Sequence, residues 1–261
     1  MLKTNEPKTP KFYTLPKIHK ENSPGRPVIS SINCHTAKLS KFADHHLQEH
    51  VVKTASYVKD TTDFLNKTRN IVVPPNSLLV TMDVKSLYTN IPNKEGISAI
   101  DDTLKRSNTD TSLKTVILTF LDMILTLNNF VLNGEHYLQI KGCAMGTKCA
   151  PTYANLFMDN FETNNIYPTT KQKTKLYLRF IDDIFMLWTG TLAELEVFEK
   201  SINEIHHSIK LTLEHSYKEI NFLDTTITIS SNGRLETKIF KKPTDRSNYF
   251  NRINFLSLIH I

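Results

Sequence analysis

Two adjacent aspartates interrupt an otherwise apolar run, "LYLRFIDDIFMLW", which extends from Leu176 to Trp188. In a regular strand Asp182 and Asp183 would point to opposite faces, so one carboxylate would enter the core. A turn at the pair removes this conflict, because aspartate tolerates the backbone conformations of tight turns. The run therefore predicts two apolar strands joined by a hairpin with the aspartates at its tip. From this stretch alone, an ordinary surface turn is a better interpretation than a metal site.

The charge of the chain is concentrated near its N-terminus. The 261 residues carry 32 Lys and Arg against 26 Asp and Glu, a net charge of +6. Residues 1–60 hold ten of the basic and five of the acidic residues, and so contribute +5 of this total. A basic segment of this kind favours a polyanionic partner, although basic proteins of other kinds are common.

Several classes of protein are disfavoured by the sequence. The three cysteines form no C-x-x-C pair, which argues against a disulfide framework and a structural zinc site. The adjacent pair His206 and His207 lacks the spacing of a helical metal site, so we interpret both as surface or core histidines. No signal peptide is visible, and no apolar run reaches the roughly 18 residues that span a bilayer. We therefore expect an intracellular protein.

The apolar periodicity predicts an α+β fold around an antiparallel sheet. Proline-rich residues 1–33 are expected to be extended or in turns. Helices are expected from about Thr36, over 60–68 with Asp60 as N-cap, over 94–107 and 112–127, from near Pro151, and after a capping box of Thr191 and Glu194. Strands are expected over 77–84 and 210–215, with further hairpins turning at Asn133-Gly134 and Asn232-Gly233.

A third aspartate changes the interpretation of the pair. Asp83 ends a second apolar strand in "MDVKSLYTNIP". If Asp83 met Asp182 and Asp183, two charges 4 Å apart would repel by ~1 kcal/mol in water and ~4 kcal/mol near a protein surface. Such a cluster persists by taking up protons or by binding cations, and carboxylate oxygens suit Mg²⁺. Spacing alone does not say whether these strands are neighbours.

The stretches "MDVKSLYTNIP", "QIKGCAMGTKCAPTYANLFM" and "FIDDIF", in this order, resemble the successive palm motifs of a reverse transcriptase. With "FYTLPKIHK", "GRPVIS" and "INFLD", the resemblance is closest to the Penelope-like retroelement enzymes, and it runs from about Phe12 to Thr244. It implies a polymerase right-hand palm with partial fingers and an antiparallel sheet packed on helices. We expect a fingers-like segment over 1–60, the palm over 61–245, and a truncated tail over 246–261 with the thumb lacking or truncated.

The resemblance also implies roles for individual residues. Asp83, Asp182 and Asp183 match the catalytic aspartates, with Asp183 usually less directly engaged. Together with the Val84 carbonyl they would bind two Mg²⁺ ions, with Mn²⁺ as the alternative. Tyr88 matches the aromatic steric gate, where a ring would clash with a ribose 2′-hydroxyl. Without the resemblance, Tyr88 is as readily a core aromatic.

The remaining implied contacts are with nucleotide and nucleic acid. Residues implied to bind the nucleotide, besides Tyr88, are Arg26, Gln139 and Gly142. Those implied to bind template or primer are Lys17, Lys20 and Gly146. Guanidinium geometry suits phosphate, and glycine permits close backbone approach. Without the resemblance, each of these basic residues is more often a solvated surface charge, and the glycines are an ordinary junction between a loop and a helix.

The resemblance therefore implies the RNA-directed DNA polymerase domain of a retroelement, acting in the nucleus. An RNA template, a DNA primer and deoxynucleoside triphosphates would be its partners. The alternative is a truncated, inactive remnant that binds nucleic acid without extending primers. A two-metal nuclease or cyclase would explain the aspartates, but not Tyr88 or the "GCAMGTKCAP" loop. Phe180 departs from the tyrosine that many reverse transcriptases carry, a change that keeps the ring.

Overall fold

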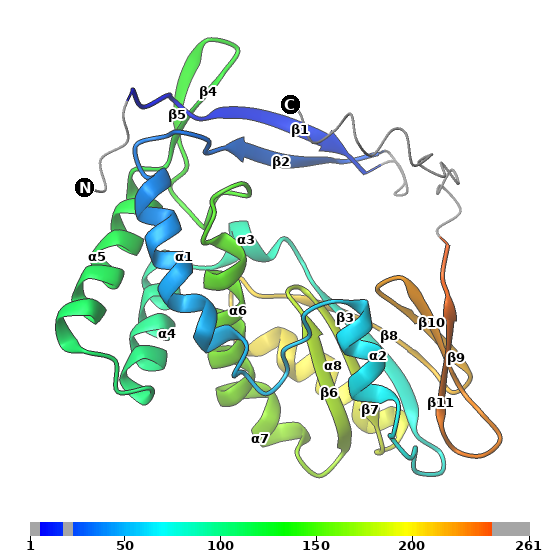
Figure 1. The fold of residues 1–261 in the computed structure, drawn as a ribbon. Helices are drawn as coiled ribbons and strands as arrows, with labels where there is room; N and C mark the ends of the chain where they lie inside the picture. Colours follow the sequence, from blue (N-terminus) through cyan, green and yellow to red (C-terminus); the bar gives the residue numbers. More distant parts are fainter. Residues whose placement is uncertain (1–5, 18–22, 242–261) are drawn as a thin grey trace, which may run out of the picture.

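A four-stranded antiparallel sheet with the order β6-β7-β3-β8 lies at the centre of the computed structural model (Figure 1). The structure describes residues 6–17 and 23–241. The strands of this sheet are β3 (Leu78–Val84), β6 (Thr174–Phe180), β7 (Asp183–Trp188) and β8 (Leu211–Ser216). Of these four strands, β3 comes first in the sequence. It nevertheless lies between β7 and β8, which follow it by about a hundred residues or more.

Helices cover one face of this sheet and enclose the main core. The inward side chains of β3 are Leu78, Val80, Met82 and Val84, and all of them belong to this core. Because side chains alternate along a strand, Leu79 points to the opposite face. The helices of this layer are α1 (Ala37–Val51), α4 (Asn93–Arg106), α5 (Thr111–Thr126), α6 (Ala150–Phe161) and α8 (Leu192–Ile205). A π-helix, η1 (Glu162–Ile166), and the short α7 (Tyr167–Thr170) continue α6.

A smaller core lies on the other face of the sheet. There Leu79, Phe185 and Leu187 pack against Phe64 of α2 (Thr61–Thr68) and Ile227 of β10. Strand β10 (Thr225–Ile229) lies between β9 (Glu219–Phe222) and β11 (Leu235–Ile239) in a three-stranded antiparallel sheet. Since both faces of β3 and β7 are covered, these strands are apolar along nearly their whole length.

A third sheet lies above the helices in Figure 1 and has the order β2-β1-β4-β5. It combines the N-terminal hairpin, β1 (Lys11–Pro16) and β2 (Gly25–Ser30), with a hairpin from the middle of the chain. That second hairpin, β4 (Asn129–Leu132) and β5 (Glu135–Leu138), turns at Asn133 and Gly134 as predicted. The Val131 amide joins the two hairpins by donating to the Pro10 carbonyl at 2.8 Å.

Most sequence predictions of secondary structure are confirmed, and two need correction. Asp60 caps α2 by accepting from the Asp63 amide, and the capping box of Thr191 and Glu194 is formed. The turn between β6 and β7 was predicted at Asp182-Asp183 but lies at Ile181-Asp182, so that Asp183 is the first residue of β7. The segment from Ile220 also contains an additional strand, β9, joined to β10 by a turn at Leu223 and Asp224. Residues 246–261 lie outside the described part of the chain.

Candidate active site

The first carboxylate of the site is carried by the central strand. Asp83 is the last residue but one of β3 and is half-buried. It is paired in register with Asp183 of β7 and with Thr212 of β8. Directly opposed residues of antiparallel strands point to the same face, so Asp83 and Asp183 share the face opposite the helical core. Both line a cavity of about 190 Å³ on this side.

The turn between β6 and β7 brings Asp182 to the end of the same central strand. The Val84 amide donates to the Asp182 carbonyl at 3.1 Å, which fastens the turn to β3. The preceding residue, Ile181, has a φ of +55°, a conformation that is an outlier for a β-branched side chain. Such strain costs of order 1–3 kcal/mol and persists only where the surrounding structure imposes it.

A second, larger cavity of about 740 Å³ brings opposite charges together. Asp83, Val84 and Asp182 line one part of it, while Arg26 of β2 and Lys17 approach from the N-terminal hairpin. Burial raises the pKa of the Asp182 carboxyl above its usual value, although the nearby positive charges of Arg26 and Lys17 act in the opposite direction. A triphosphate with divalent cations has the charge distribution that such a cavity accommodates.

Tyr88 also lines this cavity. It lies on the one-turn helix α3 (Leu87–Asn90), which follows Ser86 in the left-handed conformation. Burial, followed by the negative charge of Asp182, raises the pKa of Tyr88 to about 12. The hydroxyl therefore stays protonated, and the half-buried ring presents a fixed wall to whatever occupies the cavity.

The glycine-containing loop 142–146 connects the two sides of the cavity. A Cβ atom at Gly142 would lie 2.6 Å from the backbone of Thr89, and the next amide, of Cys143, donates to the Tyr88 carbonyl at 2.7 Å. A Cβ atom at Gly146 would lie 2.2 Å from the Ile29 carbonyl oxygen of β2. The loop thus needs glycine at both positions, because α3 contacts it on one side and β2 on the other.

The structure brings together most, but not all, of the residues predicted for the site. The residues that line the larger cavity are Lys17, Arg26, Asp83, Val84, Tyr88, Gly146 and Asp182. Asp183 lines the smaller cavity instead, and Gly142 supports α3 from outside. Gln139 lines a neighbouring cavity of about 400 Å³ and donates to the Lys141 carbonyl. Lys20 lies outside the described residues.

Sequence reasoning missed two basic residues near the site. Lys148 lines the larger cavity, and its position two residues after Gly146 in the quoted loop was a usable signal. Arg179 is fully buried beneath the turn that carries Asp182, and nothing in its spacing distinguished it from an ordinary strand residue.

The donor set of the larger cavity fits a hard divalent cation. It consists of the Asp83 and Asp182 carboxylates and a backbone carbonyl at Val84, and oxygen donors of this kind suit Mg²⁺ or Mn²⁺. The partial burial of Asp182 favours this, because a cation would offset the cost of keeping that carboxylate charged.

Another candidate metal cluster, Glu95, His206 and His207, has its ligand atoms within 4.8 Å of one another. Here, however, His206 Nδ1 accepts from the Ser208 and Ile209 amides, at 3.1 and 3.0 Å. This fixes the proton of the neutral ring on Nε2, which lies 2.7 Å from Glu95 and is then a donor rather than a metal ligand.

Comparisons with known proteins identify the family and the fold. A family model described as reverse transcriptase (RNA-dependent DNA polymerase) matches residues 18–222, more than half of the chain. A search of curated proteins gave no significant match. The fold is similar to apo telomerase of Candida tropicalis truncated from its C-terminal domain, with a TM-score of 0.64 and 13% identity over 91% of this chain and 56% of that one. It is also similar to the RNA-dependent RNA polymerase of a human picobirnavirus, with a TM-score of 0.62 and 10% identity over 89% and 47% of the two chains.

These two structural similarities show that the chain has a polymerase palm fold. The chain spans about half the length of both proteins. In the described part of the chain, no helix is long and apolar enough to cross a membrane.

Proposed function

Since the chain belongs to the reverse transcriptase (RNA-dependent DNA polymerase) family, we propose that it extends a DNA primer on an RNA template with deoxynucleoside triphosphates. The observation that carries this proposal is the hydrogen bond between the Val84 amide and the Asp182 carbonyl. It joins the end of β3 to the turn that carries Asp182. Asp83 and Asp182 line one cavity together with Arg26 and Lys17, which supports the proposal.

Six residues that line the larger cavity have a part in the proposed reaction. Arg26 and Lys17 neutralise the triphosphate and orient it, since a guanidinium forms paired hydrogen bonds with phosphate oxygens. We assign Tyr88 the part of the steric gate, because its ring lines the cavity and would favour deoxynucleotides by clashing with a ribose 2′-hydroxyl. Asp83, Asp182 and the Val84 carbonyl would hold two Mg²⁺ ions, or Mn²⁺, which when bound would supply charge stabilisation for the attacking and leaving oxygens.

The neighbouring cavity supports a path for the template. Phe12, Phe130 and Tyr137 form an aromatic series with successive ring centroids 5.6 Å apart. All three line the cavity that contains Gln139, and that cavity shares Pro27, Thr89 and Met145 with the larger one. Aromatic faces stack with unpaired bases whatever their sequence. We place the template base next to be copied in this region, and the incoming nucleotide in the larger cavity.

We also propose that the chain is part of a Penelope-like retroelement protein that acts in the nucleus. The motifs "FYTLPKIHK", "GRPVIS" and "INFLD" support this assignment. In this view, residues 1–60 are a fingers-like segment and residues 61–245 contain the palm.

Primer extension on an RNA template tests the proposed activity, with Asp182→Asn and Asp183→Asn as a matched pair. Both variants remove one charge with little change in shape, but only Asp182 lines the larger cavity. We expect Asp182→Asn to lower kcat by about 10²–10³-fold, the typical effect of removing one group that stabilises the transition state. Asp183→Asn should cost clearly less. Equal activity of wild type and Asp182→Asn would refute the site, and salt-dependent binding without extension by the wild type would favour the remnant that only binds nucleic acid.

A further inference from the structure

Arg179 is a fully buried charge on β6, three residues before Asp182. All five of its N–H donors have acceptors. Nε donates to Glu162 Oε1 at 2.6 Å, and Nη2 donates to Glu162 Oε2 at 3.4 Å and to the Asn155 carbonyl at 3.1 Å. Nη1 donates to Asn155 Oδ1 at 2.7 Å and to the Ile181 carbonyl at 3.1 Å. The guanidinium thus links α6, η1 and the turn that carries Asp182.

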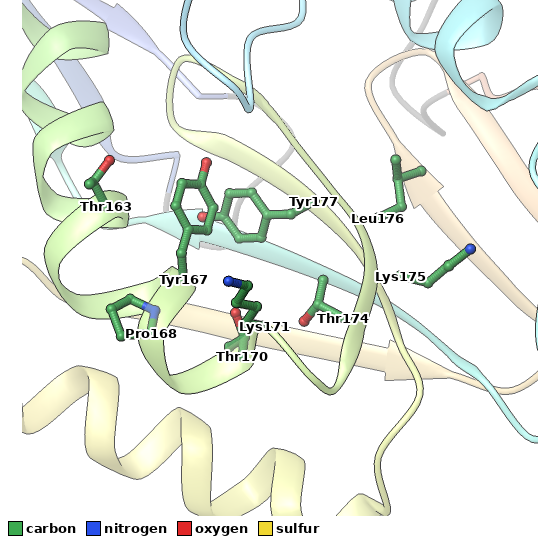
Figure 2. Close-up of a pocket in the computed structure, with 9 residues that line it drawn as sticks. All are labelled: Thr163, Tyr167, Pro168, Thr170, Lys171, Thr174, Lys175, Leu176 and Tyr177. Carbon is green, nitrogen blue, oxygen red and sulfur yellow. The ribbon is translucent and has the colours of Figure 1, made fainter.

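Glu162 is the anchor of this arrangement. It is fully buried at the first residue of η1, where the change from α-helix to π-helix occurs. Besides Arg179, its carboxylate accepts from Ser56 Oγ at 2.7 Å, from the Tyr177 hydroxyl at 3.0 Å and from the Tyr167 hydroxyl at 3.4 Å. Figure 2 shows the two tyrosine rings side by side, 5.5 Å apart and edge to face, beside a cavity of about 530 Å³. Glu162 therefore has little freedom to move.

The backbone of Arg179 is held as firmly as its side chain. Its amide donates to the Ser56 carbonyl at 2.6 Å, and its carbonyl accepts from the Val58 amide at 2.9 Å. The segment around Tyr57 thus pairs with β6 at the edge of the central sheet. These contacts fix the position from which the guanidinium reaches the turn.

The hydrogen bond from Arg179 to the Ile181 carbonyl restrains the backbone that positions the Asp182 carboxylate. Ile181 has the strained φ of +55°, and its carbonyl belongs to the peptide that leads into Asp182. On the other side of that residue, the Asp182 carbonyl accepts from the Val84 amide. The turn is therefore held at two successive carbonyls, one bonded to Arg179 and the other to the central strand.

Stability alone does not account for the ion pair. A buried pair is often no more stabilising than apolar residues of the same volume, because both charges lose their hydration. A π-helical segment within a longer helix is also frequently found at a functional site. The buried Arg179–Glu162 pair and the π-helix η1 therefore both point to a requirement other than folding.

We propose that Arg179 is a positioning residue that, held by Glu162 and Asn155, keeps the strained Ile181-Asp182 turn in the geometry that places the Asp182 carboxylate in the larger cavity. The consequence for catalysis rests on the proposed function, whereas the consequence for the geometry of the turn does not.

The decisive variant is Arg179→Met combined with Glu162→Gln. It removes both buried charges, so neither charge is left buried without its counter-ion. The amide oxygen at residue 162 can still accept hydrogen bonds from Ser56 and Tyr177. The Ile181 carbonyl nevertheless loses its donor. Arg179→Lys is the companion variant, because it keeps the charge beside Glu162 but lacks the planar fork that spans Glu162, Asn155 and Ile181. Leu121→Ala is the control, since it removes a buried side chain of α5, a helix that supplies none of the hydrogen-bond partners of Arg179 or Glu162.

Hydrogen exchange of the Val84 amide reports directly on the turn, because its acceptor is the Asp182 carbonyl. In the double variant and in Arg179→Lys, we expect the protection of this amide to fall at least about tenfold more than that of the other β3 amides. In Leu121→Ala, all β3 amides should change together. Unchanged relative protection of Val84 in both Arg179 variants overturns the proposal, whether or not the wild type is active.

Mn²⁺ binding and primer extension test the catalytic consequence. If the carboxylate shifts by about 1 Å, kcat should fall about 10²-fold with little change in the KM for the deoxynucleotide, and Mn²⁺ should bind more weakly. A wild type that neither binds Mn²⁺ nor extends primers refutes the proposed function, while the exchange result still decides the role of Arg179. Normal kcat and Mn²⁺ affinity in the double variant, with an active wild type, overturn the positioning role.

Discussion

Replacing Gly146 by alanine should separate the two sides of the larger cavity. Gly146 has a φ of +114°, and a Cβ atom there would lie 2.2 Å from the Ile29 carbonyl oxygen. Since real Cβ contacts are essentially never under 3.0 Å, β2 and the loop must move apart by at least 0.8 Å, the difference between 3.0 and 2.2. The hydrogen bond from the Ile29 amide to the Met145 carbonyl, 2.8 Å long, lies directly at this contact.

The expected loss of stability has two parts, the conformational cost of positive φ and the loss of one backbone hydrogen bond. The positive φ costs an alanine of order 1–3 kcal/mol. Loss of a backbone hydrogen bond adds about 0.5–1.5 kcal/mol. We therefore expect Gly146→Ala to lower the free energy of unfolding by roughly 1.5–4.5 kcal/mol. Because Arg26 lies on the displaced strand, the KM for the deoxynucleotide should rise by about tenfold or more, as a misplacement approaching 1 Å costs up to about 10²-fold.

Gly134→Ala is the matched control. Gly134 has a φ of +85°, but a Cβ atom there would meet nothing within 4 Å. It therefore carries only the conformational cost. Urea unfolding measures both variants, and primer extension at varied deoxynucleotide concentration measures the site. If Gly146→Ala destabilises no more than Gly134→Ala and leaves KM unchanged, close contact with β2 is not the reason for glycine at position 146.

Two further predictions concern stability. The Tyr153 hydroxyl is buried without a hydrogen-bond partner among the described residues. Tyr153→Phe should therefore leave the free energy of unfolding unchanged or raise it by about 1 kcal/mol. If urea unfolding shows a free energy of unfolding lower by more than about 1 kcal/mol, the hydroxyl has a partner. Burial lowers the pKa of His50 below its ordinary value of 6.5. The unfolded chain then binds more protons, so stability should fall as pH decreases below about 6.5 and should level off once pH passes below the folded pKa. His50→Gln should weaken this dependence in denaturant titrations at several pH values, and an unchanged profile would assign it to other groups.

Local chemistry made the helix starts and two hairpin turns predictable. Asp60 and the pair Thr191 and Glu194 are capping residues whose effect depends only on the next few backbone amides. Asn133-Gly134 likewise specifies its turn, because both residues accept positive φ. Features of this kind need no knowledge of distant parts of the chain.

The turn at Ile181 shows where such reasoning ends. Local rules place aspartate in the turn and isoleucine in the strand, yet Ile181 has positive φ and Asp183 lies in β7. The register of β7 against β3, which pairs Asp183 with Asp83, overrides the local preference. The turn at Leu223 was missed because local rules likewise place leucine in a strand, whereas Leu223 has positive φ between the paired strands β9 and β10.

The composition of the candidate site was more predictable than its geometry. The motifs identified seven residues of the larger cavity, but not Lys148, and they did not show that Asp183 would face the smaller cavity. The buried pair of Arg179 and Glu162 was not foreseeable, because its members lie 17 residues apart on a strand and a π-helix. Only tertiary packing makes the two side chains partners.

The position of β3 in the central sheet has a consequence for how the molecule folds. The hairpin of β6 and β7 closes over a two-residue turn, whereas β3 pairs with β7 and β8 only after a loop of about a hundred residues has closed. Closing such a loop costs entropy before any long-range contact compensates for it, so local pairings form first. The hairpin that carries Asp182 should therefore form early, and Asp83 should join it late. During synthesis, β3 leaves the ribosome well before either neighbour exists, and its apolar faces and unpaired edges then need protection from aggregation.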